Sequence, residues 1–211
     1  MGRREEKKQE KRQRLESSAL DLFDQLGYDR ASIELIAAAS DVARGTYYLY
    51  FPDKLALFAA LGDRWYVPMR GLLLDTAQRV SGAKSASDLI GIWTEMGVGL
   101  ALLGVAYPRE IAVAFRELRR SGEAGDDLRR READLLEIAV AFTRSAADAG
   151  LLQTGDPRLA AYVVYGAGER LYWEMLRGTD LGDPLEGARE VVRIFARAFG
   201  LGDVEVPLLP R

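Results

Sequence analysis

Apolar side chains recur along this chain at intervals of three and four residues, which is the spacing of one helix face. In the first such stretch Leu15, Ala19 and Phe23 share a face, and Gly27, a residue type that tolerates positive φ, stands where the stretch ends. The alternating runs and hairpin dipeptides typical of strands are missing from the sequence. The pattern therefore predicts an all-α protein of about nine helices.

Three short helices are expected first. The first ends at Leu26, the second begins after a Ser32 cap, and the third runs from about Arg44 to Phe51, because Pro52 disfavours helical geometry in the residue before it. Breaks at glycine and proline divide the remainder into six longer helices, near residues 53–80, 86–104, 108–121, 125–149, 156–178 and 184–200.

The length of 211 residues suits one mid-sized domain or two small ones. Since short helices give way to long ones near residue 54, we expect a helix-turn-helix domain over residues 1–54 and a helical body over residues 55–211.

The charges are unevenly distributed. Residues 1–14 hold seven Lys or Arg against three Glu, whereas the whole chain carries a net charge of −3, so the remainder carries −7. A basic arm on an acidic body favours local contact with an anion, although a solvated charge run explains the same residues equally well.

Several kinds of chemistry are excluded by composition. The chain has no Cys and no His, which rules out disulfides, thiol nucleophiles, Cys/His zinc sites and histidine triads. No paired-carboxylate motif, phosphate-binding loop or metal-spaced cluster stands in their place. We therefore expect no catalysis, no metal and no cofactor.

No apolar run is read as long enough for a membrane span, and the charged N-terminus lacks the apolar core of a secretory signal. The expectation is a soluble, cytoplasmic protein with no membrane partner.

The segment from Ile33 to Phe58 reads as a short helix, a tight turn at Asp41, a second short helix and the start of a third. It holds no carboxylate from Arg44 to Pro52. A helix with such a surface suits a polyanion, and the major groove of DNA is wide enough to admit it.

The most specific string is Gly45-Thr46-Tyr47-Tyr48-Leu49-Tyr50-Phe51-Pro52-Asp53-Lys54. It follows the pattern Gly-Thr-(apolar)-Tyr-x-(His/Tyr)-Phe-x-x-Lys, and over roughly residues 12–58 the chain resembles the TetR family of transcriptional regulators. The body beyond residue 58 has the length and helix count of that family without a diagnostic motif.

Tyr47 and Phe51, at i and i+4, are expected to enter the core, which turns their neighbours outward. The residues predicted to bind double-stranded DNA are Arg44, Gly45, Thr46, Tyr48, Leu49, Tyr50 and Lys54.

Arg44 is the candidate for reading a base edge, Gly45 permits close approach, and Leu49 suits a thymine methyl group. The hydroxyls of Thr46, Tyr48 and Tyr50 can donate to phosphate oxygens. The alternative for Tyr48 and Tyr50 is that they are half-buried and serve only in packing. The resemblance implies a phosphate contact for Lys54.

Three residues depart from the pattern of the family. Asp41 replaces the usual turn glycine, Ala43 replaces a serine cap, and Glu34 stands where many relatives carry arginine. Asp tolerates left-handed geometry better than most residues, and Glu34 is assigned to the favourable end of a helix dipole.

The resemblance implies a homodimer formed by the last two helices. Gly166 permits close helix approach, and the final helix has a wide apolar stripe; a monomer that buries these faces itself is the alternative. The predicted interface residues are Tyr162, Gly166, Val191, Phe195 and Phe199.

The resemblance also implies a small-molecule pocket in the body. Residues 89–105 are nearly all apolar, and large aromatic side chains beside Gly97 and Gly99 can leave a cavity, although plain core packing explains them too. The candidate ligand-binding residues are Trp93, Glu95, Met96, Phe115, Arg116, Phe142 and Tyr165.

The leading functional hypothesis is a ligand-responsive repressor that binds a palindromic operator as a homodimer and is released by a small-molecule effector. The alternative is a helical small-molecule-binding or adaptor protein without specific DNA binding, which the departures at Glu34 and Ala43 keep open.

Overall fold

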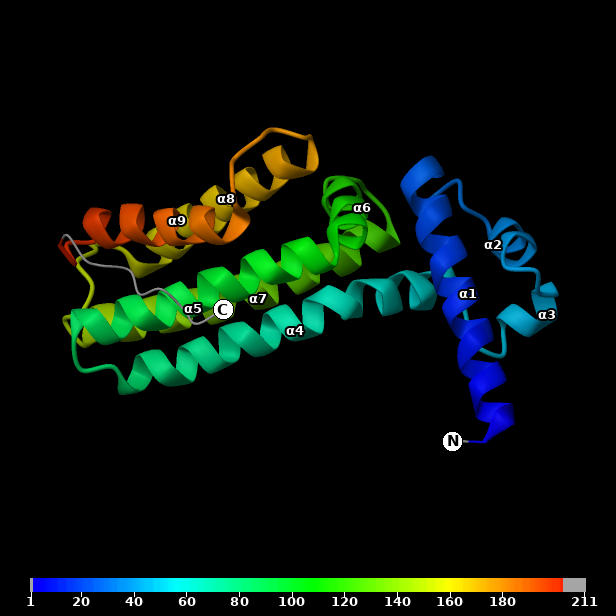
Figure 1. Ribbon diagram of the computed structural model, residues 1–211, viewed down its shortest axis with the longest axis horizontal. Helices are drawn as coiled ribbons and strands as arrows, with labels where there is room; N and C mark the ends of the chain where they lie inside the picture. The colour runs from blue at the N-terminus through cyan, green and yellow to red at the C-terminus, as the bar shows by residue number, and fades with distance from the viewer. Residues whose placement is uncertain (1, 203–211) are drawn as a thin grey trace. The chain divides into compact units, whose positions relative to one another are not determined.

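The computed structural model describes residues 2–202, and within them it contains nine α-helices and no strand, as expected (Figure 1). The helices are α1 (Arg3–Leu26), α2 (Ile33–Ala39), α3 (Arg44–Tyr47), α4 (Lys54–Gly82), α5 (Ala86–Ala106), α6 (Pro108–Leu118), α7 (Glu123–Asp148), α8 (Pro157–Leu176) and α9 (Pro184–Ala198).

The helices pack into two compact units. The first unit comprises Met1–Tyr66 with Tyr107–Arg130, and the second comprises Val67–Ala106 with Arg131–Arg211. Helices α4 and α7 each contribute residues to both units. The predicted boundary near residue 54, between a helix-turn-helix domain and a helical body, remains a prediction.

The core of the first unit forms on the predicted face of α1. Leu15, Ala19 and Phe23 are fully buried, and the ring of Phe23 packs against Tyr28 and Phe58 with centroid separations of 5.6 and 5.5 Å. Tyr28 and Phe58 meet edge to face at 5.0 Å. Burial of this aromatic cluster joins α1, the loop after it and the start of α4.

Gly27 ends α1 as expected, with φ of 81° and its N–H donating to the Phe23 carbonyl at 3.0 Å. A Cβ at this position would lie 2.8 Å from a guanidinium nitrogen of Arg120. Both the backbone angle and the close approach of the arginine therefore require glycine.

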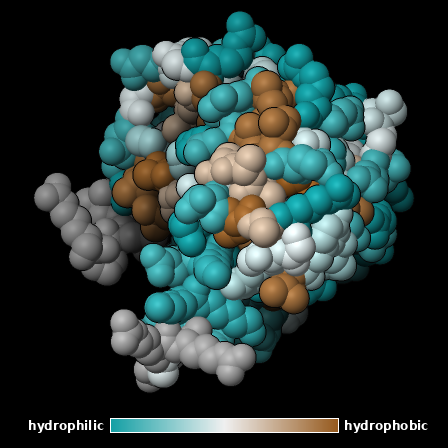
Figure 2. Space-filling model, turned by 90° about the vertical axis from the view of Figure 1, so that its right-hand side faces the viewer, coloured by the Kyte–Doolittle hydropathy of each residue, from teal (hydrophilic) through white to brown (hydrophobic). Residues whose placement is uncertain are grey.

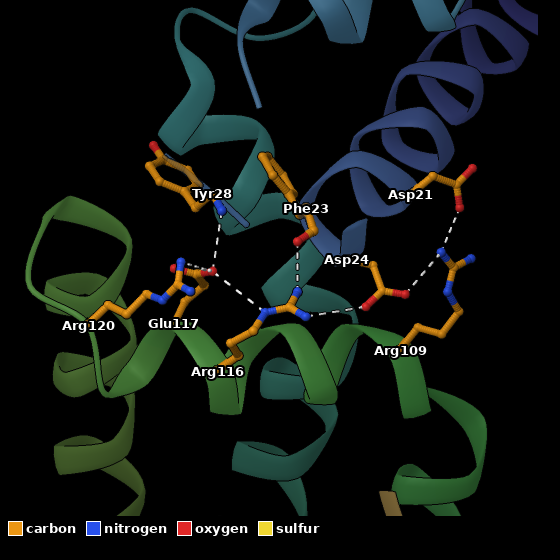
Figure 3. A network of polar contacts seen from close by, with 8 residues as sticks. All are labelled: Asp21, Phe23, Asp24, Tyr28, Arg109, Arg116, Glu117 and Arg120. Atoms are coloured by element: carbon orange, nitrogen blue, oxygen red, sulfur yellow. Dashed lines mark hydrogen bonds and ion pairs between the residues drawn. The ribbon is translucent and has the colours of Figure 1, made fainter. Parts of the chain in front are cut away.

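Helix α6 meets the end of α1 through arginines (Figure 3). Arg116 donates to the Phe23 carbonyl at 2.7 Å and lies 3.6 Å from Asp24. Arg109 pairs with Asp21 at 2.6 Å. Cations at this end of α1 satisfy a terminal carbonyl and suit the helix dipole. Arg116, predicted as a ligand anchor, is thus engaged within the first unit.

Glu117 occupies the buried end of the same network (Figure 3). Only 2% of its side chain is exposed; it accepts a hydrogen bond from the Tyr28 N–H at 3.3 Å and pairs with Arg120 at 3.4 Å. A buried carboxylate is tolerated only when it is paired, so this contact fixes α6 against the loop after α1.

In the second unit α5 packs along α9 (Figure 1). A Cβ at Gly97 would meet Val192 at 3.5 Å, and one at Gly99 would lie 2.7 Å from Leu72 of α4. Side chains from neighbouring helices thus cover Gly97 and Gly99, beside which the sequence analysis expected a cavity.

Within the described residues, α5 is long and apolar enough to cross a membrane by length and composition. The expectation that no apolar run is long enough for a membrane span is therefore wrong, because Glu95 is the one charged residue from Leu89 to Ala106. The core helix of a soluble protein passes the same test, and packing against α9 covers part of α5, whereas Leu102 and Val105 are exposed.

Glu117→Ala is expected to lower the free energy of unfolding by about 2–4 kcal/mol, because it removes the acceptor of the Tyr28 N–H and the anion beside Arg120. Urea denaturation measures the change. The control Asp75→Ala removes an exposed carboxylate 3.6 Å from Arg79 and is expected to cost less than about 1 kcal/mol. Equal effects of the two variants would contradict the role of Glu117.

Candidate nucleic-acid interface

Helix α2 starts at the predicted cap. The Ser32 hydroxyl accepts a hydrogen bond from the Leu35 N–H at 3.2 Å, and Ile36 and Ala37 are buried. The cap and the two apolar contacts hold this short helix against α1.

The turn after α2 depends on Asp41, which has φ of 52°. Within the described residues it is the one non-glycine residue with positive φ. The Val42 N–H donates to the Ala37 carbonyl at 3.0 Å, which closes the turn. Aspartate therefore takes the left-handed geometry that the usual glycine provides, at a cost of about 1 kcal/mol.

Helix α3 is shorter than the sequence predicted. Its α-helical part ends at Tyr47, and the chain then winds more tightly, with the Leu49 N–H donating to the Thr46 carbonyl at 3.1 Å and the Tyr50 N–H to Tyr47 at 2.9 Å. Ala43 gives no side-chain cap. An uncapped start and the proline after Phe51 together explain the short helix.

Tyr47 and Phe51 anchor this segment as expected. Tyr47 is fully buried and Phe51 nearly so, with ring centroids 6.0 Å apart. The Tyr47 hydroxyl donates to the Asp53 carbonyl at 2.9 Å. Burial raises the pKa of the Tyr47 phenol, so it remains a hydrogen-bond donor at neutral pH.

Arg44, Gly45, Tyr48 and Leu49 are exposed, and we call these four residues the recognition surface. Leu49 is 78% exposed. A Cβ on Gly45 would meet nothing within 4 Å. Figure 2 faces the side on which α2 and α3 lie in Figure 1, and shows hydrophilic residues around smaller apolar groups.

The remaining residues predicted to bind DNA are less exposed. Thr46, Tyr50 and Lys54 are all partly buried. The Lys54 ammonium group donates to the carbonyls of Tyr28 at 2.8 Å and Asp29 at 3.4 Å, and it lies 4.1 Å from the Tyr28 ring centroid. Lys54 thus binds the loop after α1, an inward contact that the sequence motif did not reveal.

A contact across the turn was also missed. Arg44 pairs with Glu34 of α2 at 3.0 Å and donates to the Tyr48 hydroxyl at 3.4 Å. Hydrogen bonds from its own backbone N–H and from Ser32, and then the charge of Arg44, lower the pKa of the Glu34 carboxyl. Glu34 therefore lies in the first turn of α2, where its charge suits the helix dipole as predicted, and also pairs with Arg44.

The basic arm is helical and forms the start of α1. Lys7, Lys8, Lys11 and Arg12 are all exposed, and the Arg12 guanidinium carbon also lies 5.1 Å from the Phe51 ring centroid. The side chains of the first two arginines of the arm lie outside the described residues.

The candidate ligand-binding residues fall in different units. Phe115 and Arg116 belong to the first unit, and the second unit holds Trp93, Glu95, Met96, Phe142 and Tyr165. Glu95 pairs with Arg79 at 2.5 Å on an exposed face. The Trp93 Nε1–H group is buried without a hydrogen-bond partner, which makes it available to an acceptor.

A cavity of about 10 Å³ lies in the first unit, enough for about one water molecule. Its lining includes Phe23, Phe58, Trp65 and Glu110. None of the candidate ligand-binding residues lines it.

Apolar side chains on α8 and α9 are exposed to solvent. Tyr162 is exposed and Gly166 open, whereas the other predicted interface residues, Val191, Phe195 and Phe199, are partly buried. Four further exposed large hydrophobic residues lie on the same two helices and were not among the predicted interface residues: Leu159, Val163, Leu171 and Ile194.

Comparison with known families gives one match to this region. Residues 17–61 match the family model described as bacterial regulatory proteins, tetR family. The matched segment contains α2, α3 and the recognition surface, as well as the buried residues that support it.

Individual proteins are similar to larger or smaller parts of the chain. The HTH-type transcriptional regulator YuxN of Bacillus subtilis is 37% identical over 57 residues, which cover 27% of this chain and only 20% of YuxN. NalD, the secondary repressor of the MexAB-OprM multidrug efflux pump in Pseudomonas aeruginosa, aligns with a TM-score of 0.72 and 21% identity over 92% of this chain and 98% of NalD.

SmeT, the repressor of the Stenotrophomonas maltophilia multidrug efflux pump SmeDEF, aligns with a TM-score of 0.70 and 22% identity over 95% of this chain and 96% of SmeT. A structure of SmeT in complex with triclosan aligns equally well.

The solved structures, at this level of identity, establish the fold of the whole described chain. The family match rests on the N-terminal helices, where the motif and the geometry agree. Residues 17–61 thus match the tetR family of bacterial regulatory proteins, and the described chain shares the fold of the solved structures.

Proposed function

We propose that this protein is a ligand-responsive repressor that binds a palindromic DNA operator as a homodimer and leaves it when a small-molecule effector binds. The observation that carries the proposal is the recognition surface, which projects from a segment without carboxylates and is held by the buried rings of Tyr47 and Phe51. This is the arrangement that the major groove requires of a reading helix.

In the proposed complex Arg44 donates to a guanine edge and Leu49 contacts a thymine methyl group. Gly45 lets the backbone approach the groove closely. The hydroxyls of Tyr48 and Tyr50 donate to phosphate oxygens, which fixes the register without reading sequence.

A dimer is needed because one short helix reads only a few base pairs. Two recognition surfaces about 34 Å apart match successive turns of a palindromic operator. The exposed apolar residues of α8 and α9 support a two-fold interface, since such a face is self-complementary.

Effector binding is proposed from the fold shared with SmeT, which has been solved with triclosan. The unpartnered Nε1–H of buried Trp93 suits an acceptor on a largely apolar molecule. Release requires the effector to bind the free dimer more tightly than the DNA-bound one. Helix α4 starts at Lys54 and continues into the second unit, so we assign it the role of lever.

The alternative is a helical small-molecule-binding or adaptor protein without specific DNA binding. The observation that favours it is the pairing of Arg44 with Glu34, which offsets the positive charge of the recognition surface. Selection of duplexes from a random pool separates the two functions. Enrichment of a palindrome supports the repressor, whereas no enrichment at low ionic strength supports the alternative.

Arg44→Ala is expected to lose discrimination at one base pair of each half-site, by about 1–3 kcal/mol, because the donor fork to guanine is gone. Binding to operator variants selected from the pool measures this change. Arg177→Ala, an exposed arginine at the end of α8, serves as the control and should leave discrimination intact. Equal discrimination by wild type and Arg44→Ala would refute base reading by Arg44.

Lys54→Ala is expected to weaken binding to all duplexes and to flatten the slope of log K against log salt by about one unit. It should also lower the free energy of unfolding by about 1–2 kcal/mol, since its ammonium group binds the Tyr28 carbonyl and ring. Titrations at several salt concentrations and urea denaturation measure the two effects separately. Lys84→Ala, in an exposed loop, should change neither.

Ile194→Lys is expected to raise the dimer dissociation constant at least about tenfold, because two lysines would face each other across a two-fold interface. Sedimentation velocity measures the dimer directly. The control is Leu102→Lys on α5, where the native leucine is exposed to the same degree. Dissociation caused by the control alone would place the interface elsewhere.

A further inference from the structure

The pairing of Glu34 with Arg44 places a carboxylate immediately beside the proposed reading side chain. The two groups come from different helices and lie 3.0 Å apart. Arg44 also donates to the Tyr48 hydroxyl at 3.4 Å, and its guanidinium carbon lies 5.9 Å from the Tyr48 ring centroid. The guanidinium therefore contacts both an anion and an aromatic side chain.

A guanidinium without such neighbours binds a phosphate as readily as a guanine edge, because both offer it acceptors in a fork. Phosphate contacts carry no sequence information and account for non-specific binding. A carboxylate 3 Å from Arg44 changes this balance, since a phosphate that approaches Arg44 also approaches Glu34 and is repelled. A base edge has no net charge and meets no such repulsion.

The pair also presents a donor–donor–acceptor pattern. In the major groove a G·C pair shows two acceptors on guanine, N7 and O6, followed by the N4 donor of cytosine. Arg44 can donate to the two guanine acceptors while a Glu34 oxygen accepts from cytosine. An A·T pair shows acceptor, donor, acceptor and does not match this order.

We propose that Glu34 is a specificity-determining residue, which directs Arg44 to a G·C pair and away from phosphate. The proposal rests on the DNA-binding function proposed above. Glu34 and Arg44 are both largely exposed, with 56% and 62% of their side chains accessible. An exposed pair is held weakly, so a matching base pair can rearrange it at little cost.

Glu34→Gln tests the proposal, because it removes the charge and keeps the size of the side chain at an exposed position. In the full chain, affinities for the selected operator and for an unrelated duplex of equal length are measured over a range of salt. We expect tighter binding to the unrelated duplex, a salt slope steeper by about one unit per subunit, and a ratio of specific to non-specific affinity lowered at least about tenfold.

Glu34→Asp keeps the charge but shortens its reach. It should retain the weak non-specific binding of the wild type and lose preference for cytosine at the contacted pair. Asp75→Asn, which removes a negative charge from another exposed arginine pair, is the control for net charge and should leave the affinity ratio unchanged.

The outcomes separate this inference from the proposed function. A wild-type protein that selects a palindrome, together with a Glu34→Gln variant of equal affinity ratio and salt slope, overturns the role of Glu34 alone. An equal shift in Asp75→Asn also overturns it, because the effect would then come from net charge. A wild-type protein that selects no sequence overturns both.

Discussion

The recognition surface depends on the burial of the Tyr47 side chain. The α-helical part of α3 is only four residues long, too short to be stable by its own hydrogen bonds. Its conformation is therefore held by tertiary packing. The Tyr47 ring is fully buried, and its hydroxyl donates a hydrogen bond to the Asp53 carbonyl. Because adjacent residues of a helix point in different directions, anchoring Tyr47 turns its neighbour Tyr48 outward, and Arg44 at the start of the helix is exposed as well.

The residues that follow α3 are held by several contacts with other parts of the first unit. Arg12 of α1 lies over the Phe51 ring, and Lys54 binds the carbonyl of Tyr28. The backbone N–H of Tyr28 in turn donates a hydrogen bond to the carboxylate of Glu117 on α6. The polar contacts that join α6 to α1 thus reach the same loop that Lys54 holds, so the position of α6 and the start of α4 are tied to one short stretch of chain.

Much of this architecture was predictable because its causes are local. Helical spacing, the Ser32 cap, the positive φ at Gly27 and the tolerance of Asp41 for the same geometry all act within a few residues. The outward direction of Tyr48 follows equally from the inward direction of its neighbour Tyr47. These features are set by neighbours in sequence, and reading them required no knowledge of tertiary contacts.

The partners of charged side chains were not predictable from the sequence. Arg116 and Glu95 remain predicted ligand-binding residues, and in the structure Arg116 donates to the carbonyl of Phe23, 93 positions away, while Glu95 pairs with Arg79 of another helix. Helical periodicity gives the face on which such a residue lies but not which charge lies opposite. The contact of Glu34 with Arg44 was missed for the same reason.

Under the proposed function, weak non-specific attraction has a consequence for regulation. The chain is acidic overall, and Arg44, a cation of the recognition surface, is paired with Glu34. Attraction to any duplex is then modest, and affinity depends on both subunits contacting their half-sites at once. A coupling energy of about 1–3 kcal/mol, typical of allosteric proteins, is enough to change occupancy substantially when one half-site alone binds weakly. A carboxylate that sharpens recognition would therefore also make the dimer easier for an effector to release.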